Sequence, residues 1–395
     1  MSRLYPFIRN TGIRKQESFR ISLVPELPRI LCLKDEEDNM NARISDLIDP
    51  LVEQAISQEL FRGAVIRVDY KGKPLIEHPR GHAQWDETAK IPMEADYLFD
   101  LASLSKLFSS TAVLRIISRG DIRTNTKIVD LLGFKNSFVN DSLAHLPVSS
   151  LLDHSSGIHY WFPFYTRRRD SFEEILASVL TEHPLKDHMI YSDLNFMLIG
   201  LCIERIMGKS LPQAMQELLF DPINLKHTTY SPPVSRTVAT EFGNRIEQQM
   251  VDDLGLSFSS WRDTSSAFRG VCDDGNCHYY FGGASGHAGI FADAADVTRL
   301  GNLYSDPDSM DFISPSVLAV ACTKQRSDRG FGFQFGDIYP REGFGHTGFT
   351  GTYLYINPVL AVTITILTNR LHVNHPLNQN LFRKEIVEKI LSVIE

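Results

Sequence analysis

The run FDLASLSKLFSS, from Phe99 to Ser110, holds a serine and a lysine three residues apart in an otherwise apolar sequence. On a helix, residues at this spacing lie on the same side, so the Lys106 amine can reach the Ser103 hydroxyl. The start of a helix also presents unpaired N–H groups and a positive dipole end, which favour negative charge on an oxygen. We expect burial to lower the pKa of Lys106, so that a neutral amine activates Ser103 for attack on a carbonyl carbon.

The same two residues also have a purely structural interpretation. Ser103 is a suitable N-cap residue, and Lys106 can lay its apolar stem along the helix and place its amine in water. An SxxK pattern alone favours this structural interpretation. Other motifs in the chain are needed to distinguish it from the catalytic interpretation.

The elements around this pair predict an α/β (α+β) fold. The sequence from Leu104 to Ile117 is apolar on nearly every side, which indicates a buried helix that begins at Ser103 and is capped by Gly120. Upstream, apolar residues at helical spacing predict a helix over residues 44–60, with Pro50 as a point where it kinks or restarts.

Strands are expected near both ends of the chain. Residues 63–78 alternate in polarity and turn at Lys71 and Gly72, which predicts a hairpin. Further strands are expected over residues 331–338, 343–358 and 360–369, with helices over residues 172–180, 196–207, 211–219 and 380–393 and an irregular loop over 230–280. This pattern is typical of an antiparallel sheet flanked by helices, with a helical insertion between its two halves.

We therefore predict three regions. Residues 40–120 and 285–395 form the sheet domain, and residues 121–284 form a mainly helical lobe. Residues 1–39 are either an accessory arm or sequence upstream of a start at Met40, because regular apolar spacing begins only there.

The composition excludes several classes of protein. The chain has 395 residues, 43% of them hydrophobic and 22% charged, with a formal net charge of −8. These values are typical of a globular protein with a large core and give no basic face for nucleic acid. The five cysteines are scattered through a long chain, which favours free thiols in a reducing compartment.

The sequence also lacks the usual signals for export or membrane insertion. Residues 1–39 contain no continuous apolar segment followed by small residues, and no window reaches the roughly 18 apolar residues of a membrane-spanning helix. We expect a cytoplasmic protein without a transmembrane segment that acts on a small molecule.

Two further segments follow the SxxK run in order. YSDLNFMLIG contains Tyr191, and GFGHTGFTGT contains His346, Thr347 and Gly348. With FDLASLSKLF, they resemble the three motifs of serine β-lactamase-like and penicillin-binding proteins, especially the branch of class C β-lactamases, D-alanyl-D-alanine peptidases and SxxK esterases. The segments LLDHSSGI, GGASGHAGIFADAADV and LTNRLH fit the same order, and the resemblance covers the chain from about residue 44 to its end.

The resemblance implies an antiparallel sheet domain, an all-helical lobe and an active site in the cleft between them. It also implies acyl transfer without a metal or cofactor, in which Ser103 attacks a carbonyl and Lys106 and Tyr191 share the proton transfers. The backbone N–H groups of Ser103 and Phe349 are expected to hold the oxyanion. Thr347 and Gly348 are expected to line the substrate site.

Two residues depart from the motifs of this family. Asp193 stands where many members have an asparagine, and a carboxylate cannot donate a hydrogen bond to a substrate amide. Asp193 can instead pair with Lys106, which would raise the pKa of the lysine and shift the role of base to Tyr191. His346 replaces a lysine and is mostly neutral near pH 7, which weakens binding of a substrate carboxylate. Both changes favour an esterase or an unusual amidohydrolase.

Several other residues have two interpretations each. His287 is either a secondary catalytic residue or an ordering residue of its glycine-rich loop, and His154 is expected to fix a loop by hydrogen bonds. The aromatic run of residues 159–165 either lines an acyl pocket or belongs to the core of the helical lobe. A zinc site built from Cys272, Cys277, His278 and His287 is disfavoured, because paired CxxC elements are missing.

Two other classes of protein fit less well. An α/β-hydrolase needs a GxSxG turn, and GGASGHAG carries His287 where the last glycine should stand. A catalytically silent scaffold of this fold would be expected to lack Ser103, Lys106 or Tyr191, yet all three are present. We therefore expect hydrolysis of a small ester or amide, with a D-alanyl-D-alanine carboxypeptidase or a β-lactamase as the alternative.

Overall fold

The computed structural model describes residues 27–265, 267–306 and 311–395, with side chains from residue 38 onward. The chain divides into two compact units, residues 1–39 and 40–395. Helix α1 (Leu27–Ser57) passes through Pro50 without interruption, so the proline does not restart the helix, which ends three residues earlier than its spacing predicted. The predicted role of residues 1–39 falls mostly outside the described side chains and stays a prediction.

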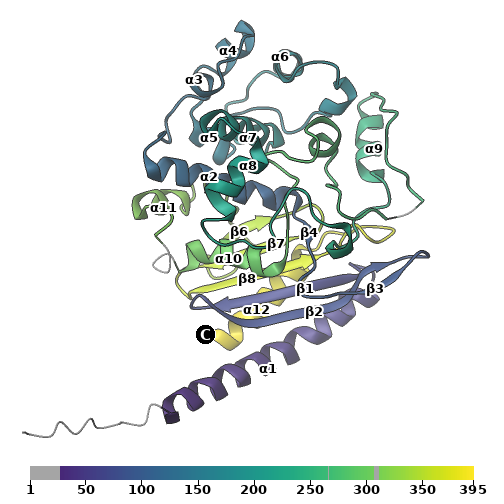
Figure 1. Cartoon of the computed structure of the whole chain (residues 1–395), viewed down its shortest axis with the longest axis vertical. Helices are drawn as coiled ribbons and strands as arrows, with labels where there is room; N and C mark the ends of the chain where they lie inside the picture. The colour runs from purple at the N-terminus through teal and green to yellow at the C-terminus, as the bar shows by residue number, and fades with distance from the viewer. Residues whose placement is uncertain (1–26, 266, 307–310) are drawn as a thin grey trace, which may run out of the picture. The chain divides into compact units, whose positions relative to one another are not determined.

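A six-stranded antiparallel sheet forms the centre of residues 40–395, in the order β3-β2-β1-β8-β7-β6. Its strands are β1 (Gly63–Tyr70), β2 (Lys73–Trp85), β3 (Lys90–Pro92), β6 (Phe344–Thr347), β7 (Tyr353–Asn357) and β8 (Val362–Thr368). β1 and β2 form the predicted hairpin, with Lys71 and Gly72 at positive φ of 51° and 69° in its turn. β1 also pairs with β8, so the sheet joins the two ends of the sequence as expected (Figure 1).

Helices cover both faces of this sheet. On one face, α10 (Ala294–Ser305) packs against β1, β7 and β8. On the other face, Ile44, Ile48 and Val52 of α1 join Ile386 and Ile390 of α12 (Asn380–Ile394) in one apolar cluster with strand residues. The spacing of these residues places them along one side of each helix, and their burial stabilises the layer by about 1.5–3 kcal/mol for each large side chain.

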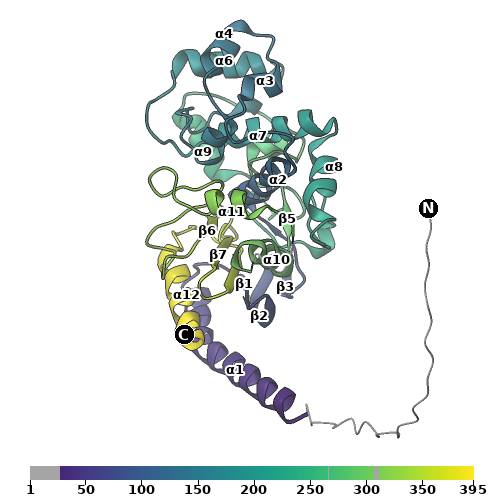
Figure 2. The same ribbon diagram turned by 90° about the vertical axis from the view of Figure 1, so that its left-hand side faces the viewer.

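Helix α2 (Ser105–Arg119) connects the sheet domain with the helices of residues 128–220. It contacts α7 (Asp193–Met207) and α11 (Pro315–Ala321), and its buried residues include most of the run from Ser105 to Leu114. Gly120 ends it in the left-handed conformation (φ 83°), as predicted. Figure 2 shows this helix among the helices above the sheet. The buried helix expected from its apolar sequence is therefore confirmed.

The other helices are short. They are α3 (Ile128–Leu132), α4 (Ser137–Leu143), α5 (Val148–Leu152), α6 (Phe172–Glu182), α8 (Leu211–Met215) and α9 (Arg245–Asp253). The helices expected over residues 172–180, 196–207 and 211–219 are present, the last as α8 followed by a π-helical turn.

Two predictions of local structure are wrong. Residues 331–338 form no strand and make only isolated bridges, since Gly332 and Gly336 have positive φ values of 85° and 112° that interrupt an extended backbone. The segment over residues 230–280 contains helix α9, whose first turn is stabilised by the Ile246 N–H donating to the Glu241 carboxylate over 3.1 Å. Across the described residues, no helix has the length and apolar character needed to cross a membrane.

Candidate active site

Ser103 lies in a tightly held turn between a short strand and helix α2. Strand β4 (Phe99–Asp100) pairs with β5 (Phe291–Ala292), and a single 3₁₀ turn, η1 (Ala102–Leu104), follows. The Asp100 carboxylate accepts a hydrogen bond of 2.9 Å from the N–H of Ala102, which has the uncommon φ of 45°. Because of this turn, the α-helix starts at Ser105, and the prediction that it begins at Ser103 is wrong by two residues.

The loop after strand β6 fixes the same turn from the other side. The Thr350 and Thr352 hydroxyls donate to the carbonyls of Asp100 and Leu101 over 2.6 and 2.9 Å. Gly348 lies so close to this turn that a Cβ atom would stand 2.4 Å from the Leu101 carbonyl oxygen, so a side chain does not fit there. Backbone far apart in sequence is therefore held directly beside Ser103.

Lys106 is fully buried and contacts the nucleophile candidate. Its ammonium donates to Ser103 Oγ over 2.7 Å and forms an ion pair of 2.8 Å with Asp193 Oδ1. Burial on its own would lower the pKa of Lys106, but the Asp193 carboxylate and the Tyr191 phenol outweigh burial and raise it. The expected lowering of this pKa is wrong, and the expected pairing with Asp193 is right. A charged Lys106 has no lone pair with which to accept the serine proton.

Tyr191 lies between two cations at the start of α7. Lys106 Nζ is 5.1 Å from the centre of its ring, and the Arg329 guanidinium carbon is 4.7 Å from it. These two positive charges balance the negative charge of a phenolate, which is the form of tyrosine that can accept a proton. The sequence motif predicted Tyr191, whereas Arg329 was missed because it lies outside the three motifs, two residues before the segment that was predicted as a strand.

His154 orders the segment that carries Tyr191. Its ring lies 4.5 Å from the Tyr191 ring, and its Nδ1 accepts a hydrogen bond of 3.1 Å from the Ser192 N–H. Burial, together with the charges of Arg329 and Lys106, lowers the pKa of His154 well below its usual value, which fits its role as an acceptor. The expected loop-ordering role of this histidine is confirmed by these contacts.

His346 is buried on strand β6 as a neutral ring. Burial, followed by the charges of Arg329 and Lys106, holds its pKa well below the usual value. Its Nδ1 donates to the Thr347 carbonyl over 2.7 Å. His346 therefore carries no fixed positive charge, as its residue type suggested.

Two cavities open on Ser103, and we name them by their charged residues. The arginine cavity, of about 430 Å³, is lined by Arg329, Arg370 and Arg383 beside His346, Thr347 and Gly348. The acidic cavity, of about 270 Å³, is lined by Asp193, Glu241, Glu247, Asp273 and Asp274. Phe349 borders both cavities and is 47% exposed. All the predicted site residues except Lys106 and His287 therefore line at least one of the two cavities. Lys106 contacts Ser103 directly.

The arginine cavity corrects one expectation. Because His346 replaces a motif lysine, this side of the site was expected to have no fixed positive charge. Three arginines from separate segments supply that positive charge instead. Of these, Arg370 lies in the segment LTNRLH that the resemblance included. No pattern in the sequence indicates that Arg370 lines the same cavity as Arg329 and Arg383.

The aromatic run of residues 159–165 divides between its two interpretations. Tyr160 and Trp161 line the acidic cavity, whereas Phe164 and Tyr165 are fully buried in apolar clusters. The first pair can contact a substrate, and the second pair stabilises the lobe.

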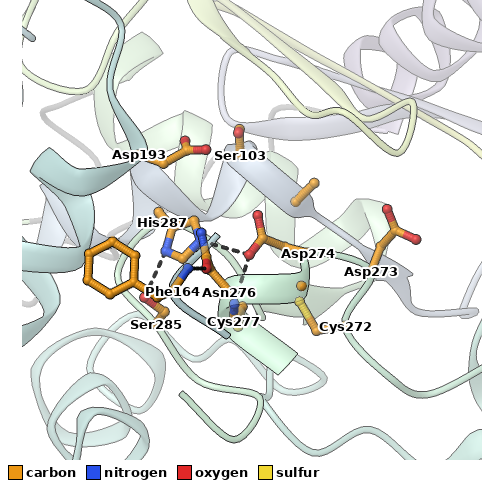
Figure 3. A network of polar contacts seen from close by, with 12 residues as sticks. Ser103, Phe164, Asp193, Cys272, Asp273, Asp274, Asn276, Cys277, Ser285 and His287 are labelled. Atoms are coloured by element: carbon orange, nitrogen blue, oxygen red, sulfur yellow. Dashed lines mark hydrogen bonds and ion pairs between the residues drawn. The ribbon is translucent and has the colours of Figure 1, made fainter. Parts of the chain in front are cut away.

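His287 supports the site from behind. Its side chain is 1% exposed, with Nε2 2.9 Å from Asp274 Oδ1 and Nδ1 2.7 Å from Ser285 Oγ (Figure 3). Its backbone carbonyl lies 3.4 Å from the Lys106 ammonium. Cys202, Cys272, Cys277 and Cys322 are free thiols, and within the described residues no group of three or more potential ligands is arranged to hold a metal ion.

A comparison with protein families decides the relationship of this chain. The model of the family described as Beta-lactamase matches residues 45–387, which is most of the chain. The chain belongs to the beta-lactamase family. The resemblance inferred from the three motifs is confirmed.

Relatives of this beta-lactamase family member act on several kinds of bond. The N-acetylmuramyl-L-alanine amidase of Bacillus subtilis (strain 168) is 27% identical over 359 residues, covering 82% of this chain and 80% of that protein. Among solved structures, EstCE1, a hydrolase with promiscuous acyltransferase activity, has a TM-score of 0.68 at 18% identity and covers 89% of this chain and 99% of its own. A class C beta lactamase from Rhodobacter sphaeroides has a TM-score of 0.65 at 18% identity, with 88% and 99% covered.

These comparisons support two statements. The predicted architecture, an antiparallel sheet flanked by helices with a helical region beside it, is the fold of the solved structures. This beta-lactamase family member is a hydrolase of the serine acyl-enzyme type.

Proposed function

We propose that the protein hydrolyses small amides or esters whose leaving group carries a carboxylate, through an acyl-enzyme on Ser103. The observation that supports the nucleophile is the 2.7 Å contact between Lys106 Nζ and Ser103 Oγ inside a buried ion pair with Asp193. The arginine cavity on the same serine supports the carboxylate.

Acylation follows from the charges of the site. Tyr191 enters the step as a phenolate beside the charges of Lys106 and Arg329, and it accepts the proton of Ser103 while Oγ forms a bond to the substrate carbonyl carbon, because the charged Lys106 cannot act as the base. The tetrahedral oxyanion receives hydrogen bonds from the backbone N–H groups of Ser103 and Phe349. Tyr191 then returns the proton to the leaving nitrogen or oxygen as the carbonyl re-forms. Water repeats these steps and releases the acid.

Arg329 is the best placed of the three arginines to bind the leaving group. Its Nε makes an ion pair of 3.5 Å with Asp328, while its Nη1 is buried without a hydrogen-bond partner among the described residues. The guanidinium of Arg370 donates to the Phe349 carbonyl over 2.9 Å, and that of Arg383 donates to the Thr352 carbonyl over 3.2 Å. A substrate carboxylate is the group that satisfies an unpaired guanidinium N–H best.

This proposal favours amides that end in a carboxylate, such as peptides with a free carboxyl end, over simple esters. D-alanyl-D-alanine carboxypeptidase and β-lactamase activity belong to the same class, because both substrates carry a carboxylate on the leaving side of the amide. The predicted cytoplasmic location favours short peptides over intact cell-wall polymer, and fractionation of cells tests that location.

A substrate panel with the purified full chain tests the proposal. The panel contains p-nitrophenyl acetate and butyrate, a chromogenic cephalosporin, and dipeptides with free or amidated carboxyl ends, each run beside Ser103→Ala. We expect Ser103-dependent cleavage and a preference for free over amidated carboxyl ends. Cleavage of the esters alone would leave the acyl-enzyme in place and overturn the carboxylate part. Turnover that survives in Ser103→Ala would overturn the nucleophile.

A further inference from the structure

The acidic cavity contains one carboxyl group that the protein itself does not satisfy. Asp193 is paired with Lys106, and Asp274 with His287. Glu241 lies 3.8 Å from Arg245, and Glu247 accepts a hydrogen bond of 2.7 Å from the Gly275 N–H. Asp273 is different, because within the described residues its carboxyl group makes no hydrogen bond and no ion pair.

The backbone on both sides of the Asp273 side chain is fixed. Its N–H donates to the Asp100 carboxylate over 2.6 Å, and its carbonyl accepts from Asn244 Nδ2 over 2.7 Å. The residue is only 6% exposed, and it lines the cavity that reaches Ser103. Figure 3 shows Asp273 beside Asp274, the residue that contacts His287. The protein therefore holds a buried hydrogen-bond acceptor in place without giving it a donor, and we expect a ligand to supply that donor.

The charges around this group indicate which donor fits. Burial first, and then the neighbouring Glu241 and Asp100, raise the pKa of Asp273 well above its usual value. Burial and Asp274 likewise raise the pKa of Glu247 to about 8. Two cations, Arg262 and Arg370, act on this group through their charge. Arg262 donates to the Cys272 carbonyl and Arg370 to the Phe349 carbonyl, and neither forms an ion pair within the described residues. A cation in the cavity would therefore stabilise the ionised form of these carboxyl groups, which burial and mutual repulsion disfavour.

The volume and the aromatic lining of the acidic cavity indicate which kind of cation fits it. The cavity of about 270 Å³ is lined by Tyr160, Trp161 and Met250 beside its carboxyl groups. Aromatic faces attract organic cations, and the volume suits an amino-acid-sized group better than a bare metal ion or a long chain.

We propose that the acidic cavity binds a primary ammonium group carried by the acyl half of the substrate, with Asp273 as its direct partner. The inference rests on the proposed function, since it takes the arginine cavity as the site of the leaving-group carboxylate. The substrate is then dipolar, with an ammonium on one side of the scissile carbonyl and a carboxylate on the other. A dipeptide with a free amino end has this arrangement.

A binding measurement on the Ser103→Ala protein tests the ammonium site without needing turnover. Calorimetry compares alaninamide with propionamide, which has the same size and no amine. We expect alaninamide to bind at least about tenfold tighter, and Asp273→Asn in the same background to remove the difference. Asp252→Asn, an exposed carboxyl on helix α9, removes the same charge and serves as the matched control. Equal affinities, or no binding of alaninamide at millimolar concentration, would overturn the ammonium site.

A kinetic comparison separates this inference from the proposed function. The four stereoisomers of alanyl-alanine and the two enantiomers of propionyl-alanine all carry the carboxylate, and only the alanyl-alanines carry the amine. We expect kcat/KM to favour alanyl-alanine by about tenfold or more in the wild type and in Asp252→Asn, and Asp273→Asn to reduce that ratio. Cleavage of both at equal rates contradicts the ammonium site and leaves the function intact. If neither is cleaved in a Ser103-dependent way, the proposed function fails and the calorimetry still decides the ammonium site.

Discussion

The arginine cavity and the acidic cavity are built in the same way from opposite charges. In each, most charged side chains are committed to the protein, as in the pair of Lys106 with Asp193 or the hydrogen bond from Arg383 to the Thr352 carbonyl. In each, some buried polar atoms have no hydrogen-bond partner among the described residues, such as Arg329 Nη1 on one side and Asp273 Oδ1 on the other. The paired side chains hold the lining of each cavity in place, and the unpaired groups are available to bind a ligand. Ser103 borders both cavities, so the contrast points to a substrate with two different ends.

The largest effect is expected from Lys106, which contacts Ser103, the serine that borders both cavities. Lys106→Ala should lower kcat/KM by about a thousandfold or more, because it removes the charge beside Ser103 and Tyr191. It should also destabilise the protein by about 3 kcal/mol, since Asp193 loses its partner. Stopped assays and thermal unfolding measure both quantities.

The double variant Lys106→Ala/Asp193→Ala separates the two consequences. It should regain part of the stability, because no carboxylate is left unpaired, and none of the activity. A double variant as active as the wild type would contradict the role of Lys106.

A smaller effect is expected at Arg329. Arg329→Gln should raise KM about ten- to a hundredfold for substrates with a free carboxylate and leave p-nitrophenyl acetate within about twofold. Arg326→Gln removes an exposed arginine from the same segment and is the matched control. Equal losses for charged and uncharged substrates would remove the distinction between the two cavities.

The acidic cavity should also make stability depend on pH. The pKa of Glu247 is raised to about 8, so its protonated form is favoured in the fold. The stability that this group contributes is complete below its unfolded value near 4.5 and is lost as pH rises toward 8. The Tm of Glu247→Gln, relative to wild type, should therefore increase by about 2 °C or more between pH 4 and pH 8. A constant difference across that window would mean that Glu247 is not perturbed.

The smallest effect is expected at His346, on the wall of the arginine cavity. The ring is neutral and donates to the Thr347 carbonyl, so His346→Asn should change KM for a carboxylate substrate by less than about fivefold. Kinetics of this variant beside Arg329→Gln show which residue supplies the charge. A loss at His346 larger than that at Arg329 would reverse the assignment.

Local sequence signals were sufficient for some parts of the molecule. Ser103 and Lys106 lie three residues apart in an apolar run, and the hairpin of β1 and β2 alternates in polarity around a Lys71–Gly72 turn. Such features depend on neighbours within a few positions, so a single sequence reveals them. A sheet assembled from both ends of the chain was predicted from the strands at those ends, and the pairing of β1 with β8 confirms it.

Other parts depend on contacts that no local pattern encodes. Arg329, Arg370 and Arg383 come from a loop, the turn after β8 and helix α12, and only the folded sheet brings them to one cavity. The sign of the Lys106 pKa shift required the 2.8 Å distance to Asp193, because burial and pairing act in opposite directions. Asp273 lies in a segment without periodicity, and its importance arises from the hydrogen bond that it does not make.

The central claim is that Ser103 is the nucleophile of an acyl-enzyme. Intact-protein mass spectrometry after incubation with a fluorophosphonate tests it most directly, with peptide mapping of the adduct and Ser103→Ala as the control. We predict one adduct per chain, located on Ser103 and absent from Ser103→Ala, while circular dichroism shows that the variant stays folded. An adduct of undiminished yield on Ser103→Ala would contradict the claim.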